Sequence, residues 1–202
     1  MIRVAVMVSG GGTNLQALID AEKNGQFPSA SIKLVIASNE KAYALERAKH
    51  ADIERMVIQR RDYASQELFD LANVTALKEH GIDLVVLAGY LSILGEPMIA
   101  AYPERILNIH PSLIPSFCGK GYYGLRVHEE ALKRGVKVTG ATVHFVNEIP
   151  DGGRILLQKA VSVQEGDTPE ILQRRVMEEA EWIILPQAVQ MVSDAMETGG
   201  KI

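Results

Sequence analysis

Cysteine, long apolar runs and an excess of positive charge are all missing or scarce in this chain of 202 residues. Cys118 is the only cysteine, which excludes a disulfide framework and a cysteine-based zinc site and is typical of a reducing compartment. The longest uncharged apolar run, residues 84–95, is too short to cross a bilayer. The first residues lead directly into a strand pattern without the features of a signal peptide. We therefore expect a cytoplasmic protein with no membrane partner.

Basic residues do not outnumber acidic ones. The chain has 21 lysine and arginine residues against 25 aspartate and glutamate residues, and its formal net charge is −4. Binding to nucleic acid generally needs a positive field, so this balance argues against nucleic acid as a partner. It leaves room for a local site that binds a small anion.

The overall composition is that of a packed globular protein, with 47% hydrophobic and 23% charged residues. This length suits one doubly wound α/β unit. We expect a single domain over residues 1–202, with a frayed end at residues 198–202.

Strand and helix patterns alternate along the chain. We expect strands at residues 2–8, 32–38, 56–58, 83–90 and 105–110, and helices that begin near residues 15, 43, 65 and 127. Residues 136–146 and 154–163 predict a final strand pair, joined either as an antiparallel pair or by a crossover. This order predicts an α/β fold with a doubly wound, mostly parallel, Rossmann-like sheet and helices on both faces.

Two helical stripes predict buried faces. In the helix over residues 65–80 the stripe consists of Leu68, Phe69, Ala72, Ala76 and Leu77. In the last helix, which begins at Pro169, it consists of Ile171, Leu172, Val176, Ile183, Ile184 and Val189.

The short strand that ends at Pro111 carries two polar residues, Asn108 and His110. Side chains two apart on a strand point to the same side, so the amide and the imidazole should face one way. Proline stops the strand there, at the edge where open parallel sheets bind their ligands. The arrangement favours an active site. The alternative is that Asn108 caps a turn and His110 is an ordinary interior histidine.

The first strand is followed by a glycine loop and a helix, residues 9–14 and onward. Such an arrangement binds phosphate through backbone N–H groups and the helix dipole. The dinucleotide fingerprint would need a glycine at Leu15, and no P-loop lysine is present, so a monophosphate is the better interpretation. Two alternatives are a nicotinamide cofactor with Asn39-Glu40 at its ribose, and a glycine turn that serves only packing.

Three loops add candidate binding groups. Residues 91–94, Leu-Ser-Ile-Leu, are apolar at the same edge of the sheet and favour a flat apolar ligand, or else simply close the core. Residues 111–124 form a long loop in which Lys120 would meet an anion or would simply be solvated. Asp151 precedes two glycines, which gives its carboxylate freedom of aim, although Asp-Gly is also a common plain turn.

Taken together, four segments resemble the phosphoribosylglycinamide formyltransferases. They are residues 9–15, residues 87–90, the run 107–115 that contains Asn-Ile-His-Pro-Ser, and residues 140–146 followed by Asp151-Gly152-Gly153. The Asn-x-His-Pro-Ser motif with a distal aspartate is shared by enzymes that use formyltetrahydrofolate, whereas the glycine loop is typical of the purine enzyme. The resemblance runs nearly end to end.

The resemblance implies direct transfer of a formyl group from 10-formyltetrahydrofolate to the amino group of a glycinamide ribonucleotide, in purine synthesis and without a metal. The implied partners are these two small molecules. We expect the protein to be a monomer or a homodimer.

The resemblance also implies roles for residues matched by position. The catalytic set would be Asn108, His110 and Asp151, and the phosphate would be held by Gly12, Thr13 and Asn14. Glu181 would bind the glycinamide end. The folate would contact Gln66, Leu91, Ser92, Ile93, Leu94, Asn108, Asn147, Glu148, Ile149, Pro150 and Asp151.

Ser92 and Gln66 stand where the family usually has arginine, and Trp182 replaces a usual histidine. The segment 118–124 is longer than the common loop. Two other functions stay open: a hydrolase that releases formate from formyltetrahydrofolate, and a non-catalytic nucleotide-binding module.

The chemistry suits the residue types. An amine that attacks a formyl carbon creates a negative oxygen, which the Asn108 amide and a protonated His110 would stabilise. Asp151 near His110 would favour the imidazolium and would help to carry away the proton that the amine loses.

Overall fold

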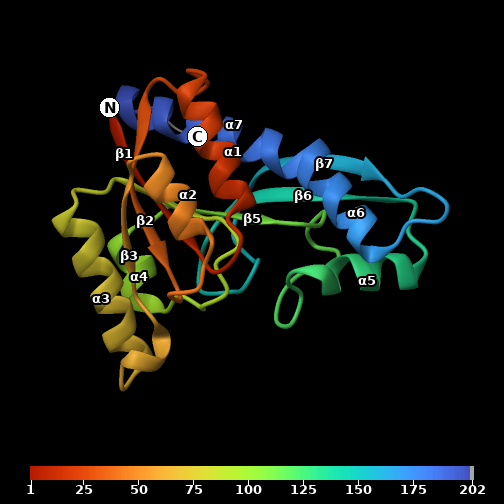
Figure 1. Ribbon diagram of the computed structural model, residues 1–202, viewed down its shortest axis with the longest axis horizontal. Coiled ribbons are helices and arrows are strands. Elements are labelled where there is room, and N and C mark those ends of the chain that lie inside the picture. The colour runs from red at the N-terminus through yellow and green to blue at the C-terminus, as the bar shows by residue number, and fades with distance from the viewer. Residues whose placement is uncertain (201–202) are drawn as a thin grey trace.

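The computed structural model describes residues 1–200, and its core is one seven-stranded sheet (Figure 1). The strands follow the order β3-β2-β1-β4-β5-β6-β7. Neighbours from β3 to β5 are parallel, and β6 and β7 are antiparallel to the strands beside them. The predicted doubly wound, mostly parallel sheet is confirmed.

The strands are β1 (Ile2–Val8), β2 (Ala30–Ala37), β3 (Glu54–Val57), β4 (Leu84–Leu87), β5 (Ile106–His110), β6 (Val138–Phe145) and β7 (Ile155–Ser162). The helices are α1 (Thr13–Lys23), α2 (Ala44–His50), α3 (Gln66–Glu79), α4 (Glu96–Ala101), α5 (Leu125–Arg134), α6 (Pro169–Val176) and α7 (Trp182–Thr198). A 3₁₀ turn, η1 (Arg60–Asp62), precedes α3, and a π-helical turn, η2 (Met177–Glu181), joins α6 to α7.

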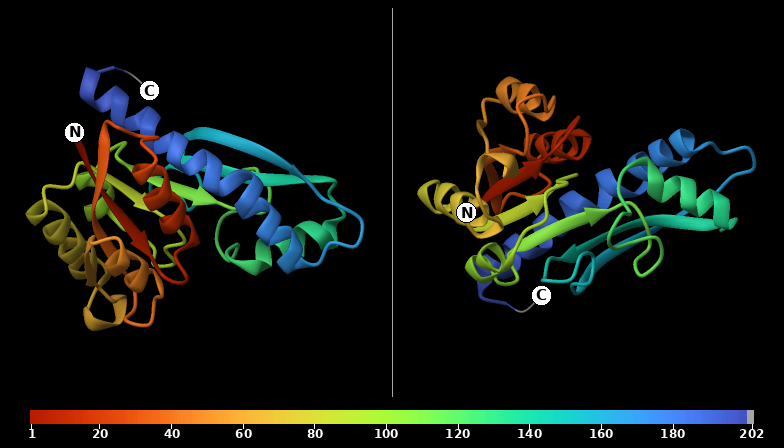
Figure 2. Two further views of the ribbon diagram at one scale, coloured as in Figure 1. Left: turned by 45° about the horizontal axis from the view of Figure 1, so that its top comes forward. Right: turned by 90° about the horizontal axis from the view of Figure 1, so that it is seen from below.

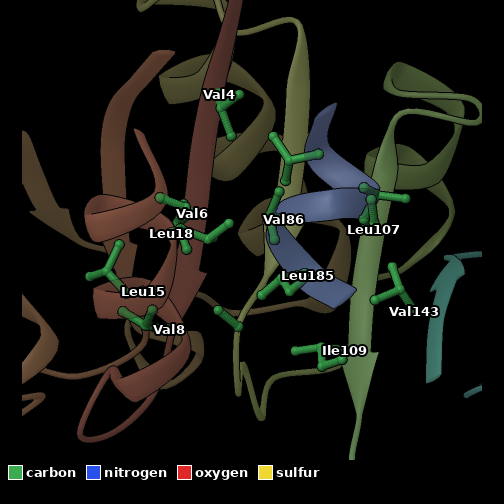
Figure 3. Close-up of a cluster of buried hydrophobic side chains, with 14 of the residues drawn as sticks. Val4, Val6, Val8, Leu15, Leu18, Val86, Leu107, Ile109, Val143 and Leu185 are labelled. Atoms are coloured by element: carbon green, nitrogen blue, oxygen red, sulfur yellow. The ribbon is translucent and has the colours of Figure 1, made fainter. Parts of the chain in front are cut away.

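Alternation along the strands builds a separate core on each face of the sheet. Val4, Val6 and Val8 of β1 face one side with Leu18 and Leu185, whereas Ala5 and Met7 face the other. Helices α1, α2, α6 and α7 cover the first face, and α3 and α4 cover the second. Figure 3 shows Leu185 among the strand side chains of the first core, and Figure 2 shows α7 running along the sheet beside α1. The central strands β1 and β4 are therefore buried on both faces, as their near-continuous apolar residues predict, whereas β3 and β7 at the two edges are largely exposed.

Several details of the predicted elements were wrong. The β4 ladder ends at Leu87 rather than at residue 90, because Gly89 turns the chain at a φ of 72°. Leu68 is half exposed, since the buried side of α3 is set by Phe69, Asn73 and Leu77.

The last predicted helix also differs from the prediction. A π-helical turn interrupts it, and Ile171 and Ile183 are exposed while Leu172, Ile184 and Leu185 are buried. The chain was predicted to fray over residues 198–202. Thr198 is the last residue of α7, and Gly199 caps the helix at a φ of 67°. Residues 201 and 202 lie outside the described residues. Within residues 1–200, no helix is long and apolar enough to span a membrane.

Candidate active site

The chain winds in opposite directions from the middle of the sheet, and the polar residues gather beside that point. β1 lies between β2 and β4, so the carboxyl ends of β1 and β4 mark the topological switch point where open α/β sheets bind ligands. β5 comes next and carries Asn108 and His110 to the same edge. The predicted strand and its two polar residues are confirmed in position.

The pairing of β5 with β6 adds His144 to this group. Asn108 lies directly opposite His144 in the antiparallel ladder, and His110 lies opposite Thr142. The Asn108 amide nitrogen lies 3.0 Å from His144 Nε2. His144 Nδ1 lies 2.8 Å from the carbonyl oxygen of Phe145, which only accepts, so Nδ1 carries the hydrogen and Nε2 accepts from Asn108. His144 thereby fixes the orientation of the Asn108 amide.

Asp151 closes the group from the loop between β6 and β7. Its backbone adopts the left-handed conformation at a φ of 55°. The turn is tight, because a Cβ at Gly153 would collide with the carbonyl oxygen of Phe145. Asp151 Oδ2 lies 3.6 Å from His110 Nδ1, and Oδ1 lies 3.5 Å from both His144 Nε2 and the Asn108 amide nitrogen. The structure therefore brings two of the predicted catalytic residues, Asn108 and His110, close to the carboxylate of the third, Asp151.

Asp151 is held ionised. Burial by itself would raise the pKa of its carboxyl, but His144, His110 and the backbone N–H of Gly119, which donates a 2.8 Å hydrogen bond, lower that pKa overall. A carboxylate at the centre of three polar groups is thus available as a fixed negative charge.

His110 differs from the sequence-based expectation of a protonated ring. Burial lowers the pKa of its imidazole and outweighs the opposing effects of Asp151 and of the Phe117 carbonyl oxygen. His110 Nε2 lies 2.9 Å from that carbonyl oxygen, so it carries the hydrogen, and Nδ1, which faces Asp151, is the basic nitrogen. At neutral pH the ring is a neutral base beside an anion, ready to accept a proton.

Two cavities meet at this group. The larger has a volume of about 570 Å³ and the smaller about 220 Å³. Asn108 and Asp151 line both of them, whereas His110 lines only the smaller. The polar residues therefore lie where two ligands would touch.

The larger cavity contains most of the predicted folate contacts. Both the 91–94 loop and the 147–151 loop line it, and Lys120 does so as well. Ile93 and Ile149 are 68% and 64% exposed, so an apolar ligand bound in this cavity would cover them.

Gln66 lies behind this cavity and is not one of its lining residues within the described chain. Its amide nitrogen donates to Asp70 at 3.0 Å and to the Ile93 carbonyl oxygen at 2.9 Å. Its side-chain oxygen accepts from Arg60 at 3.1 Å. Gln66 thus supports the apolar loop, and its predicted contact with folate stays a prediction.

The smaller cavity contains Asn14 and Glu181. The Asn14 amide donates a 2.6 Å hydrogen bond to Glu181, and burial raises the pKa of the Glu181 carboxyl to about 7. Gly12 and Thr13 are not among the described lining residues. They begin α1, which has no side-chain cap on its first N–H groups.

Gly12 also has a packing role. It adopts a φ of 71°, and a Cβ there would lie 2.6 Å from Cβ of Ala44. Gly10 and Gly11 face open space. The packing interpretation of the loop therefore holds for Gly12, and an anion site is compatible with the other two glycines.

Sequence reasoning missed several groups at the site. His144, His128, Gln173 and Tyr122 line one or both cavities, and none was assigned a role. Two signals pointed toward His144: it shares the phase of Thr142 on a strand, and it lies in the segment 140–146 that carries the family resemblance. Among residues 1–200, no cluster of histidine, cysteine, aspartate and glutamate is suited to hold a metal ion.

The loops of the site are tied together through Ser9. Its hydroxyl oxygen accepts from the backbone N–H of Leu91 at 2.8 Å and lies 2.7 Å from the hydroxyl of Ser38. The Asn39 amide donates to the Ser9 carbonyl oxygen at 2.8 Å. The glycine loop and the apolar loop are thus fixed to one another, and Asn39 has a structural role in this contact.

The fold and the site together define an α/β protein with a polar site beside the topological switch point of its sheet. Residues 2–189 match the family model described as formyl transferase, and the chain belongs to this family. It is 46% identical over 191 residues to the human trifunctional purine biosynthetic protein adenosine-3, covering 95% of this chain and 18% of that protein. The chain thus spans about a fifth of the length of that relative.

Shorter relatives match along most of their length. The phosphoribosylglycinamide formyltransferase of Haemophilus influenzae is 40% identical over 194 residues, covering 96% of this chain and 88% of that protein. The crystal structure of glycinamide ribonucleotide transformylase 1 from Symbiobacterium toebii superimposes with a TM-score of 0.90 at 45% identity. That match covers 96% of this chain and 89% of the other.

Proposed function

We propose that this protein transfers the formyl group of 10-formyltetrahydrofolate to the amino group of 5-phosphoribosylglycinamide, a step of purine synthesis. The observation that carries this proposal is the position of Asn108, His110 and Asp151 where the two cavities meet. A transfer between two small molecules needs polar groups at such a meeting point.

The cavities differ in the ligand that suits each of them. The larger is lined by the exposed isoleucines of two loops, and its size suits a flat, extended molecule such as the folate. The smaller holds Asn14 and Glu181, and it lies beside the uncapped start of α1. A helix start of this kind attracts phosphate, so the acceptor ribonucleotide belongs there.

Asn108 supplies the donor for the developing oxyanion. Its amide nitrogen has two hydrogens, and the contact with His144 uses one of them. The other makes a long 3.5 Å contact with Asp151 Oδ1, which the formyl oxygen would replace when the acceptor nitrogen forms its bond to the formyl carbon. Because His144 already orients the amide, little reorganisation accompanies the step.

His110 takes the proton that the acceptor amine loses. The neutral ring accepts it at Nδ1, and the imidazolium that forms then faces the Asp151 carboxylate. The proton passes on to the folate nitrogen as its bond to the formyl carbon breaks. Asp151 therefore stabilises a charge that exists only during the reaction.

A formyl-transfer assay tests the proposal. Purified protein, 10-formyltetrahydrofolate and the acceptor should yield formylated acceptor and tetrahydrofolate in equal amounts, and omission of the acceptor should abolish turnover. Release of formate without acceptor would instead identify a hydrolase. Binding of the acceptor with no turnover under either condition would identify a binding module.

Two further expectations belong to this proposal and remain predictions. The protein should act in the cytoplasm, and it should be a monomer or a homodimer. Cell fractionation and sedimentation analysis at several protein concentrations test them.

A further inference from the structure

His128 is buried without a hydrogen-bond partner. It lies on α5 with 0% exposure, and neither Nδ1 nor Nε2 has a partner among the described residues. The buried rings of His110 and His144 each make a hydrogen bond through at least one nitrogen. An unpartnered buried polar group destabilises the folded state. A ring with two such atoms needs an explanation.

The position of His128 supplies one. The ring lines the smaller cavity, with Asn14, Gln173 and Glu181 among its other lining residues. Val127 and Ala131 of the same helix are fully buried, and α5 packs against α6 (Figure 1). The helix therefore holds the imidazole rigidly in the wall of the cavity that an incoming ligand would enter.

The charge state of the ring selects the kind of ligand. Burial, and then the neighbouring His110, lower the pKa of His128 to about 4. At neutral pH the ring is uncharged, with one N–H donor and one acceptor nitrogen. A hydroxyl group, which also donates and accepts, matches such a ring, whereas a phosphate dianion only accepts.

We infer that His128 is a binding residue for the acceptor, and that it forms hydrogen bonds with a hydroxyl of the acceptor's ribose. The inference rests on the proposed function, since it concerns the same cavity and the same ribonucleotide. Asn14 and the start of α1 bind the phosphate end, so His128 selects a sugar that keeps its hydroxyls.

Replacement of His128 by leucine is the first test. The variant should raise the KM for the acceptor on the order of 10- to 100-fold. The kcat and the KM for the folate should stay within about twofold. The melting temperature should stay unchanged or rise, because leucine removes two unsatisfied polar atoms.

His80→Leu is the matched control. His80 hydrogen-bonds to Ala76 and Glu54 and does not line either cavity within the described chain. Its replacement should leave the KM for the acceptor unchanged. If His128→Leu also leaves that KM unchanged, or lowers kcat alone, the inference is overturned.

A modified acceptor locates the contact. An acceptor that lacks one ribose hydroxyl should bind the parent protein on the order of tenfold more weakly, and should bind His128→Leu no more weakly than the natural acceptor does. Equal losses in both proteins, for the 2′-deoxy and the 3′-deoxy acceptor alike, would rule out a contact with His128.

A measurement on the parent protein alone does not depend on turnover or on the folding of a variant. Titration with ribose 5-phosphate should shift the ring ¹⁵N resonances of His128, and inorganic phosphate should leave them unchanged. If ribose 5-phosphate leaves them unchanged too, the inference fails. Failure of the formyl-transfer assay with a positive titration would overturn the proposed reaction and retain the sugar contact.

Discussion

The side-chain amide of Asn14 donates a 2.6 Å hydrogen bond to Glu181, which lies 167 positions later in the chain. The bond joins the first turn of α1 to the π-helical turn that precedes α7. Glu181 is only 6% exposed, so its carboxyl titrates in a site that water barely reaches.

Glu181 makes the stability of the protein depend on pH. Burial raises its pKa from 4.5 to about 7, so the native state binds more protons than the unfolded state between these values. Its contribution to the free energy of unfolding is therefore full below pH 4.5 and is lost as the pH rises through about 7, a loss of about 3 kcal/mol. Glu181→Gln should lose this dependence. Urea unfolding of both proteins from pH 5 to pH 8 measures it, and parallel stability curves would contradict the assignment.

The glycine loop gives a test of the phosphate site that is free of strain. Gly11 faces open space, so Gly11→Asp should fold normally and repel the phosphate, with a rise in the KM for the acceptor on the order of tenfold or more. Gly11→Asn has nearly the same shape without the charge and serves as control. Gly12→Ala should instead lower the melting temperature, because its Cβ would meet Ala44. If Gly11→Asp and Gly11→Asn have equal KM values for the acceptor, the acceptor's phosphate does not bind at this loop.

The apolar loop gives a test of the folate cavity. Ile93 is 68% exposed and lines that cavity, so Ile93→Asp should raise the KM for the folate on the order of tenfold or more while stability and acceptor binding stay nearly unchanged. Ile171→Asp is the matched control, since Ile171 is 49% exposed and lines neither cavity. Unchanged folate affinity in Ile93→Asp would place the folate elsewhere.

The three central residues should act on kcat rather than on binding. Asn108→Ala, His110→Ala and Asp151→Ala should each lower kcat by about 10² to 10⁴, because their interactions form chiefly in the transition state. The double variant of His110 and Asp151 should be little worse than the worse single one, since the two act as a unit. Rapid-mixing kinetics with both substrates saturating measures these losses. A His110→Ala protein that folds and turns over at the parent rate would exclude the mechanism.

Asp151→Asn should move the acid limb of the pH–rate profile. Burial lowers the pKa of His110, and the charge of Asp151 opposes that effect. Removal of the charge should lower the pKa further, so His110 stays a neutral base to a lower pH and the acid limb of kcat/KM moves to lower pH. Asp167→Asn, whose carboxylate pairs with Arg175, should leave the limb in place. If the acid limb of kcat/KM stays in place in Asp151→Asn as well as in Asp167→Asn, a group other than His110 determines its pH.

Much of the fold could be predicted because its signals are local. The apolar run of β1, the glycines after it and the stripe of α1 are each contained in a few consecutive residues. The errors arose where a single position depends on distant partners. Leu68 fits the helical spacing whether its side chain is buried or exposed. Only the packing of Phe69 and Leu77 against the sheet decides between these two possibilities.

The site shows the same division. Asn108 and His110 share a strand, so their common direction followed from the sequence. His144 became a neighbour only through the register of β5 against β6, which no local pattern specifies. The neutral state of His110 also escaped prediction, since the opposing effects of burial and Asp151 can be weighed only in three dimensions.

Under the proposed function, the wall that the two cavities share predicts that both substrates bind before the formyl group moves. Asn108 and Asp151 line both cavities, so donor and acceptor can reach the same two side chains at once. The formyl group then never needs to rest on the protein. We expect sequential kinetics through a ternary complex, with intersecting rather than parallel double-reciprocal plots, and no formylated protein when the folate is added alone.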